Sequence, residues 1–437
     1  MGKSFVKTEK GKKKYTVLGR LIEDLTVYQR LIVIVFLGFL LRVAILIFSI
    51  PGMTRFMGDT KAYVWRSKNI LDGKVPYRDF KDTKPPLWSY SLALWFKLLG
   101  KEPTVTGVKA FILIFSMLNI LLIYLIAQRL FSEKEALITA LFFALNPLDI
   151  FNSMSFGRYD AVPLFFALLS FYYLQKMRWK LSALFLGIAI MFKYIVGLLL
   201  FPYIIYLFYQ EKVEEEKKGI ELRSLTAFMK EEKVWKYVFI VFSFCFIIAL
   251  PFLLIDWYDY LYYTLDFAHG PRPGISIYGV ISHALIYYHP EMDWIRGLGP
   301  IEILLEFSLL VFVTKKVLKG QKNLENTKFV FLAFLWSVLL ISLSMTVGPQ
   351  YFEYSMPWLG MLFAKYLYSS NKSLRLIIST MLIPPAVVLS YLLYSNHFEI
   401  SSKGLYYVWY GLGVIFLDLL VFYALIKYYA VFIKKTA

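Results

Sequence analysis

The chain has 437 residues, of which 59% are hydrophobic and 18% are charged, and its formal net charge is +18. Apolar runs of about 20 residues, the length that crosses a bilayer, recur along the whole sequence, which argues against a soluble multidomain protein. The basic residues lie between these runs, where they are typical of cytoplasmic loops that contact anionic lipid headgroups. The positive charge therefore does not indicate binding to nucleic acid.

The N-terminal segment, residues 1–30, is rich in lysine and has leucines at helical spacing. This pattern predicts a basic cytoplasmic segment with a short helix on the membrane surface. The first apolar run, 31–50, is too long for the core of a signal peptide and predicts a transmembrane helix that is retained. We expect the transmembrane domain to occupy residues 31–437.

An outer loop is predicted at 51–106, and two amphipathic stretches within it, around 61–71 and 87–99, are typical of helices that lie in the membrane interface. The apolar runs that follow the loop are expected to form the remaining spans, and they lie at 107–128, 136–152, 160–175, 181–210, 237–255, 299–318, 329–347, 356–369, 376–394 and 406–428.

The run 181–210 decides the topology, because 30 residues would make one helix about 45 Å long, too long for a comfortable span. Lys193 lies near its middle, so we predict two short helices that turn there. An all-α polytopic protein of about 12 transmembrane helices results, with both termini and the loop 211–236 in the cytoplasm and the loop 256–298 outside, as the positive-inside rule requires. We expect the membrane to be the cell membrane of a prokaryote or archaeon, or the endoplasmic reticulum membrane.

Asp59 is the first acidic residue after the first span. It precedes a helical pattern that ends at Gly73, so one interpretation is a helix N-cap. The other is a general base at the membrane surface, which would take the proton from an attacking hydroxyl group. Both interpretations stay open, since one carboxylate can serve both purposes.

Several motifs together resemble the GT-C superfamily of integral-membrane glycosyltransferases. Near Asp59 the chain has G-x-x-P-Y at 73–77 and the sequence KPPL at 84–87, which is similar to the aminoarabinose transferase and protein O-mannosyltransferase group. The order of further motifs resembles GPI-anchor mannosyltransferase I and the polyprenyl-phosphate-mannose-dependent mannosyltransferases. These motifs are Asn146-Pro147, Gly157-Arg158-Tyr159-Asp160, the helical pair around Lys193, RPGISIY at 272–278 and Gln350-Tyr351-Phe352.

The resemblance implies an inverting glycosyltransferase with a GT-C fold. It would move a hexose, by resemblance mannose, from a polyprenyl-phosphate or dolichyl-phosphate carrier to a lipid or glycan acceptor on the non-cytoplasmic side. Asp59 is the expected base. The residues expected to bind the donor phosphate are Lys84, Lys193, His269 and Arg272. Those expected to contact the acceptor or the sugar are Arg158, Asp160, Gln350, Tyr351 and Glu353, the last also as a second acid.

Structural interpretations stand beside these roles. Lys84 and Lys193 are also typical of lysines whose ammonium groups reach the lipid headgroups. Asp160 precedes a helical run and predicts an N-cap, with orientation of Arg158 or of a sugar hydroxyl as the functional alternative. Arg42 lies inside the first span, and we interpret it as structural.

A donor that its lipid phosphate already activates needs no nucleotide domain, and the motifs of nucleotide-binding proteins are missing where they would matter. No cofactor is expected. A single carboxylate at Asp59, where GPI-anchor mannosyltransferase I has a D-x-D motif, is a poor metal site, although a divalent metal is not excluded. The alternatives are a flippase or other transporter of lipid-linked sugars, a protein O-glycosyltransferase, and a non-catalytic scaffold subunit.

Overall fold

The computed structural model describes residues 289 and 291 and the ranges 25–47, 58–216, 231–269, 299–318, 324–342 and 349–367. In the described part every regular element is a helix, and the β structure there is one isolated bridge between Pro76 and Phe80. The predicted all-α class is therefore confirmed. The spans predicted at 376–394 and 406–428 lie outside the described residues, so the count of 12 spans stays a prediction.

The first helices agree closely with the sequence prediction. Helix α2, Val27–Ile47, forms the first span and keeps most of its surface exposed, as expected of a helix in lipid. The two interfacial helices predicted in the following loop are α3, Gly58–Leu71, and α4, Pro86–Leu99. Helix α4 begins at a proline, which needs no hydrogen bond to its nitrogen in the first turn, and ends at Gly100 in the left-handed conformation.

The next helices form the centre of the bundle. Helix α5, Val105–Leu130, crosses the whole bundle, and helix α6, Glu133–Ala144, starts with a capping box between Ser132 and Glu135. The following elements are α7, Pro147–Ile150, the π-helical turn η2, Phe151–Ser155, α8, Ala161–Gln175, and α9, Trp179–Phe192.

The run 136–152 was predicted to be one span, but the structure divides it. The chain bends by 41° between α6 and the segment Pro147–Ser155. Pro147 cannot donate a backbone hydrogen bond to the preceding turn, and the Asn146 side chain accepts a hydrogen bond from Leu148 N instead, which starts a new helix in a new direction.

The run 181–210 also breaks where the sequence predicts it. Lys193 has an extended backbone, with φ −158° and ψ 109°, and separates α9 from the 3-10 helix η3, Tyr194–Leu199, and helix α10, Leu200–Glu216. The predicted division of this run at Lys193 is therefore confirmed.

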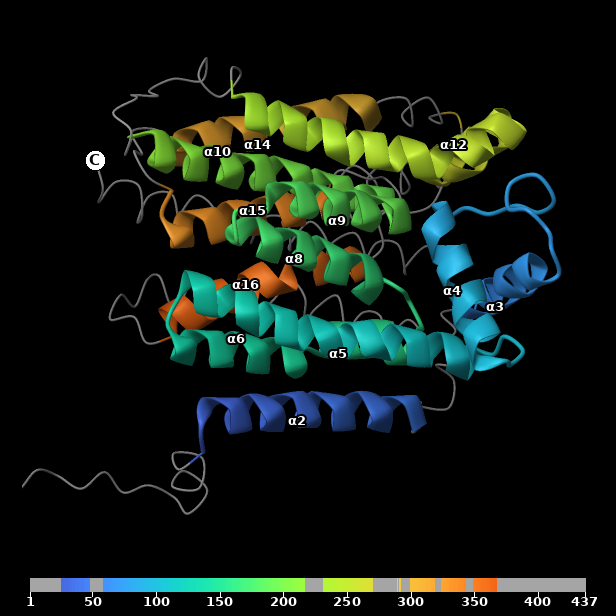
Figure 1. Ribbon diagram of the computed structural model, residues 1–437, viewed down its shortest axis with the longest axis horizontal. Coiled ribbons are helices and arrows are strands. Elements are labelled where there is room, and N and C mark those ends of the chain that lie inside the picture. The colour runs from blue at the N-terminus through green and yellow to red at the C-terminus, as the bar shows by residue number, and fades with distance from the viewer. Residues whose placement is uncertain are drawn as a thin grey trace, which may run out of the picture.

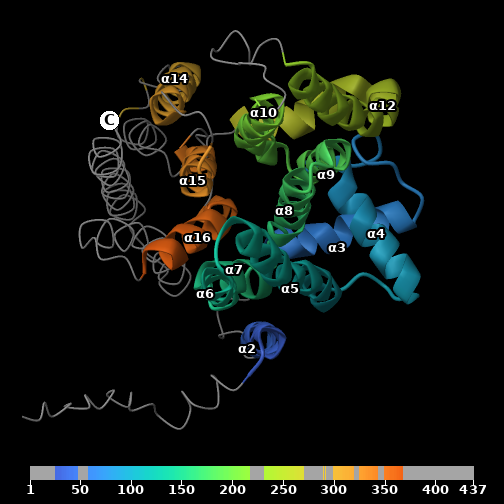
Figure 2. The ribbon, with the colours of Figure 1, turned by 60° about the vertical axis from the view of Figure 1, so that its left-hand side comes forward.

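The remaining helices close the bundle. They are α12, Glu232–His269, which contains Pro251 and a non-helical residue at Asp256, α14, Gly299–Leu318, α15, Asn326–Ser342, the 3-10 helix η5, Pro349–Tyr354, and α16, Met356–Tyr366. Most helices of the bundle run side by side, and α3 and α4 lie together at one end of the bundle (Figures 1 and 2).

The described residues contain four helices long and apolar enough to cross a membrane, or five if the bent pair that begins at Glu133 is counted as one span. The chain is an integral membrane protein. Its largest apolar core packs α5, α6, α8, α9, α10, α15 and α16 against one another, and a second core joins α3 and α4 to α5 and α8. Helices α3 and α4 are thus fixed to the end of the bundle by side-chain packing.

Candidate active site

Asp59 lies in the first turn of α3 and its side chain is exposed, whereas the next residue, Thr60, is fully buried. The Thr60 hydroxyl donates a hydrogen bond to the Phe156 carbonyl oxygen at 3.1 Å. The start of α3 is therefore held against the turn that joins η2 to α8. The exposed Asp59 lies next to this contact.

Gly157 makes the close contact between this turn and α3 possible. Its φ is +62°, and a Cβ atom built on it would lie 2.4 Å from the Thr60 Oγ1 atom and 3.4 Å from Lys109 Cε. The Lys109 ammonium, from the first turns of α5, donates a hydrogen bond to the Ser155 carbonyl oxygen at 3.0 Å. Two helices therefore hold the turn, and only glycine fits between them.

We expect Gly157→Ala to lower the turnover number by up to about 100-fold, since the new methyl group pushes the start of α3, and with it Asp59, out of position. Gly73→Ala is the matched control, because Gly73 also has a positive φ, +83°, but a Cβ atom there meets nothing within 4 Å. Both variants bear the backbone cost of about 1–2 kcal/mol. Equal turnover in the two variants, measured in detergent-purified protein, would show that the contact does not position Asp59.

Asp160 and Lys193 form a buried ion pair with 2.5 Å between the Lys193 Nζ and Asp160 Oδ1 atoms. Asp160 occupies the N-cap position of α8, but its side chain makes no capping hydrogen bond. The predicted cap position is thus correct, and the carboxylate serves Lys193 instead. The Lys193 ammonium also lies over the Tyr159 ring, 5.2 Å from its centroid.

Lys84 belongs to a tightly bonded loop between α3 and α4. The Lys84 backbone N–H donates to Asp82 Oδ1 at 3.0 Å, and the Lys84 carbonyl oxygen accepts from the Tyr77 hydroxyl at 2.6 Å. The buried Asp82 carboxylate also lies 3.1 Å from Arg66 Nε and accepts from the Ser89 hydroxyl at 2.5 Å. These contacts hold the backbone of Lys84 in a defined place at the start of α4.

The charged side chains of α3, of the loop before α4, of the turn before α8 and of the break after α9 lie close to one another. Burial lowers the pKa of Lys84 to about 8, an effect that the Asp59 carboxylate opposes and the Lys193 ammonium reinforces. Asp59 and Asp160 both lie within electrostatic reach of the Tyr63 hydroxyl, as does the half-buried Arg158. The structure therefore brings together five of the predicted site residues from four separate segments of the chain.

Three aromatic rings pack together beside these charges. Trp88 of α4 stacks on Tyr159 with 4.3 Å between ring centroids, and Tyr63 of α3 meets both rings edge-on, at 5.1 Å from Trp88 and 5.6 Å from Tyr159. All three are buried. Because Lys193 lies over the buried Tyr159 ring, its electrostatic interactions are less screened than those of a group in water.

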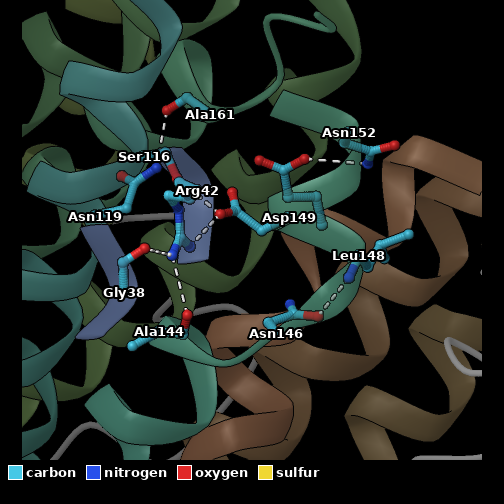
Figure 3. A network of polar contacts seen from close by, with 11 residues as sticks. Gly38, Arg42, Ser116, Asn119, Ala144, Asn146, Leu148, Asp149, Asn152 and Ala161 are labelled. Atoms are coloured by element: carbon cyan, nitrogen blue, oxygen red, sulfur yellow. Dashed lines mark hydrogen bonds and ion pairs between the residues drawn. The ribbon is translucent and has the colours of Figure 1, made fainter. Parts of the chain in front are cut away.

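A second polar network lies deeper in the bundle (Figure 3). Arg42 of α2 forms a fully buried ion pair with Asp149 of α7. The Arg42 guanidinium also donates to Ser116 Oγ at 2.7 Å and to the carbonyl oxygens of Gly38 and Ala144 at 3.0 and 2.9 Å. Arg42 was predicted to have a structural role, and Asp149 is its partner in that role.

The C-terminal site residues of the prediction are only partly described. Glu353, in η5, is fully buried, and its Oε2 atom accepts a hydrogen bond from the Asn152 amide at 3.2 Å. Gln350 and Tyr351 lie in the same short helix, and His269 ends α12, but their side chains lie outside the described residues, as does the whole of Arg272. The roles proposed for these four residues stay predictions.

Four residues that the sequence did not single out belong to the site or to its support: Thr60, Lys109, Asp149 and Asn152. Lys109 and Asp149 left a signal in the sequence, since each is a charge inside an apolar run, where a specific partner is the usual explanation. Thr60 and Asn152 left none. In the described part of the chain, no three His, Cys, Asp or Glu side chains lie together as a metal site would require.

Comparison with known proteins supports the resemblance that the motifs indicated. Residues 83–230 match the family described as dolichyl-phosphate-mannose-protein mannosyltransferase. GPI mannosyltransferase 1 of Saccharomyces cerevisiae is 28% identical over 186 residues, which is 40% of this chain and 44% of that protein. The chain thus spans less than half the length of this curated relative.

Two solved structures are similar at low sequence identity. ArnT from Cupriavidus metallidurans, bound to undecaprenyl phosphate, has a TM-score of 0.47 at 13% identity, over 95% of this chain and 79% of that chain. The oligosaccharyltransferase AglB from Archaeoglobus fulgidus, in complex with an inhibitory peptide and a dolichol-phosphate, has a TM-score of 0.41 at 10% identity, over 92% of this chain and 55% of that chain.

The sequence matches confirm the predicted resemblance to GT-C glycosyltransferases. The separate likeness of the KPPL segment, Lys84–Leu87, to the aminoarabinose transferase and protein O-mannosyltransferase group stays a prediction.

Proposed function

We propose that this protein is an inverting glycosyltransferase that moves a hexose from a polyprenyl-phosphate or dolichyl-phosphate carrier to a lipid or glycan acceptor on the non-cytoplasmic side of the membrane. One observation supports this most directly: the exposed Asp59 carboxylate lies within electrostatic reach of the Lys84 ammonium, which in turn lies near Lys193. A base that activates the acceptor hydroxyl and two cations that stabilise the leaving phosphate are the groups that transfer from a sugar phosphate requires.

Asp59 takes the proton of the acceptor hydroxyl as its oxygen attacks the anomeric carbon of the sugar. The bond between that carbon and the carrier phosphate oxygen breaks on the opposite face, so the configuration inverts. The electron pair stays with the phosphate, whose growing negative charge Lys84 and Lys193 stabilise. Asp160 holds the Lys193 ammonium in place through their ion pair.

Mannose is the hexose we propose, since both the matched family and the yeast relative are described as mannosyltransferases. A lipid or glycan is proposed as the acceptor because the yeast relative is named for a glycolipid anchor. A protein acceptor is the second possibility, since the family description names a protein mannosyltransferase.

Purified protein incubated with radiolabelled polyprenyl-phosphate mannose and a native lipid extract should yield a labelled glycolipid. The same carrier loaded with glucose is the control for the sugar. A labelled protein instead of a lipid would change the acceptor and keep the chemistry. If no sugar is transferred, and the carrier moves between the leaflets of liposomes that contain the protein, the chain is a transporter and the proposal is wrong.

The pH dependence of transfer should reveal Lys84. Its pKa of about 8 means that the free protein loses this positive charge as the pH rises through 8, and kcat/KM for the donor should fall there. Lys84→Arg keeps its charge and should remove this decline. Lys84→Met should lower kcat/KM about 10- to 100-fold at pH 7, the size of a lost hydrogen bond to a charged group.

The exposed Lys97, in the last turn of the helix α4 that follows Lys84, provides the control, and Lys97→Met should leave the pH profile unchanged. If Lys84→Met and Lys97→Met behave alike at pH 7, Lys84 does not bind the donor phosphate.

A further inference from the structure

Two fully buried carboxyl groups lie close together in the network around Arg42. Helix α7, which carries Asp149, packs against η5, which carries Glu353, and Glu353 lies within hydrogen-bonding reach of Asp149. Asp149 Oδ2 accepts hydrogen bonds from Arg42 and from Ser116 Oγ, and Glu353 Oε2 accepts one from Asn152. The other oxygens, Asp149 Oδ1 and Glu353 Oε1, have no hydrogen-bond partner among the described residues.

Among the residues that the structure describes, the charges around this pair do not balance if both carboxyl groups are ionised. Arg42 supplies one positive charge and is paired with Asp149. Asp160, the next carboxylate near Glu353, is already paired with Lys193. A second unpaired negative charge in the bundle interior would be very unfavourable, and a buried group in this position gives up its charge by binding a proton.

We propose that Glu353 carries a proton and donates it as a hydrogen bond from Oε1 to Asp149 Oδ1. This bond satisfies both unpartnered oxygens and leaves one positive and one negative charge in the network. It also gives Glu353 a role other than that of a second acid or an acceptor contact: Glu353 is a positioning residue that joins η5 to α7.

The structure indicates what Glu353 positions. The side chain of Asn152 donates to Glu353, and the carbonyl oxygen of the same asparagine accepts the Arg158 N–H at 2.8 Å. Arg158 and Asp160 lie in the turn that contacts the start of α3. The neutral carboxyl group of Glu353, 201 residues along the chain from Asn152, therefore ties η5 to the turn that supports Asp59 and Lys193. This inference rests on the proposed function for its effect on catalysis, but not for the protonation state.

Infrared spectroscopy of the purified full-length protein measures the protonation state directly. At neutral pH the wild type should show the carbonyl band of a protonated carboxylic acid, and Glu353→Gln should lack it. Glu102→Gln, at an exposed acid, is the matched control and should keep the band. A band that persists in Glu353→Gln, or that is lost only in Asp149→Asn, would mean that Glu353 is ionised and would overturn the proposal.

Sugar transfer then tests the positioning role separately. A glutamine amide can donate to Asp149 as a protonated glutamate does, so Glu353→Gln should retain a kcat up to about 100-fold higher than that of Glu353→Ala, in which the turn is released. If Glu353→Gln is as slow as Glu353→Ala, Glu353 is needed for its acid chemistry and the positioning role is wrong. Failure of the proposed transfer reaction would leave the infrared result unaffected, so the two failures can be told apart.

Discussion

Replacement of Asp59 by asparagine should lower kcat for sugar transfer by about 100- to 10,000-fold, the contribution of a positioned general base. Asparagine has the same shape but cannot take up the proton of the acceptor hydroxyl. Because Asp59 is exposed, the change should not disturb the packing of α3, and the melting temperature should stay at the wild-type value. Transfer from radiolabelled polyprenyl-phosphate mannose, at saturating donor, measures the effect.

Asp72→Asn is the matched control, since Asp72 is an exposed acid directly after the same helix and should be dispensable. Turnover at the wild-type rate in Asp59→Asn would show that another carboxylate is the base. Asp160 would be the next candidate, but it is buried and paired with Lys193. Glu353 would be a candidate base only if it were ionised, against the proposal above.

Arg42→Met should lower the free energy of unfolding by about 3–5 kcal/mol, because it leaves the Asp149 carboxylate buried without its counter-ion. The loss should be measurable by denaturant titration of the detergent-purified protein. The double variant Arg42→Met/Asp149→Asn should regain most of the lost stability, since asparagine removes the unpaired charge and still offers an oxygen to Glu353.

Lys236→Met is the comparison for an exposed ion pair. Lys236 and Glu232 are 56% and 77% exposed, and pairs of this kind contribute about 0–1 kcal/mol. If Arg42→Met costs no more than Lys236→Met, or if the double variant is no more stable than the single one, the buried ion pair does not stabilise the fold.

Where the sequence alone succeeded, the signal was local. The lengths of the apolar runs predicted helices such as α2 and α5, because the bilayer requires a fixed helix length. The amphipathic stretches predicted α3 and α4 to within a few residues, and a lysine in an apolar run predicted the break between α9 and η3. The resemblance to GT-C glycosyltransferases, which the sequence matches confirm, likewise came from short motifs in order.

Where the sequence alone failed, the outcome depended on neighbours far along the chain. The run 136–152 is the exception, since it has the composition of a span but its bend has a local cause, Pro147 and the capping of Leu148 by Asn146. Asp160 has the sequence pattern of an N-cap, but its side chain bonds to Lys193 because α8 and α9 pack side by side.

The sequence by itself determined that this chain is a helical membrane protein, which segments are apolar, and which charged residues are costly enough to need a partner. The tertiary structure alone decided the partners: Asp149 for Arg42, Asp160 for Lys193 and Asn152 for Glu353. The physical reason is that helix length and periodicity depend on residues within a few turns, whereas a buried charge is stabilised by whichever group the packing of distant helices places beside it.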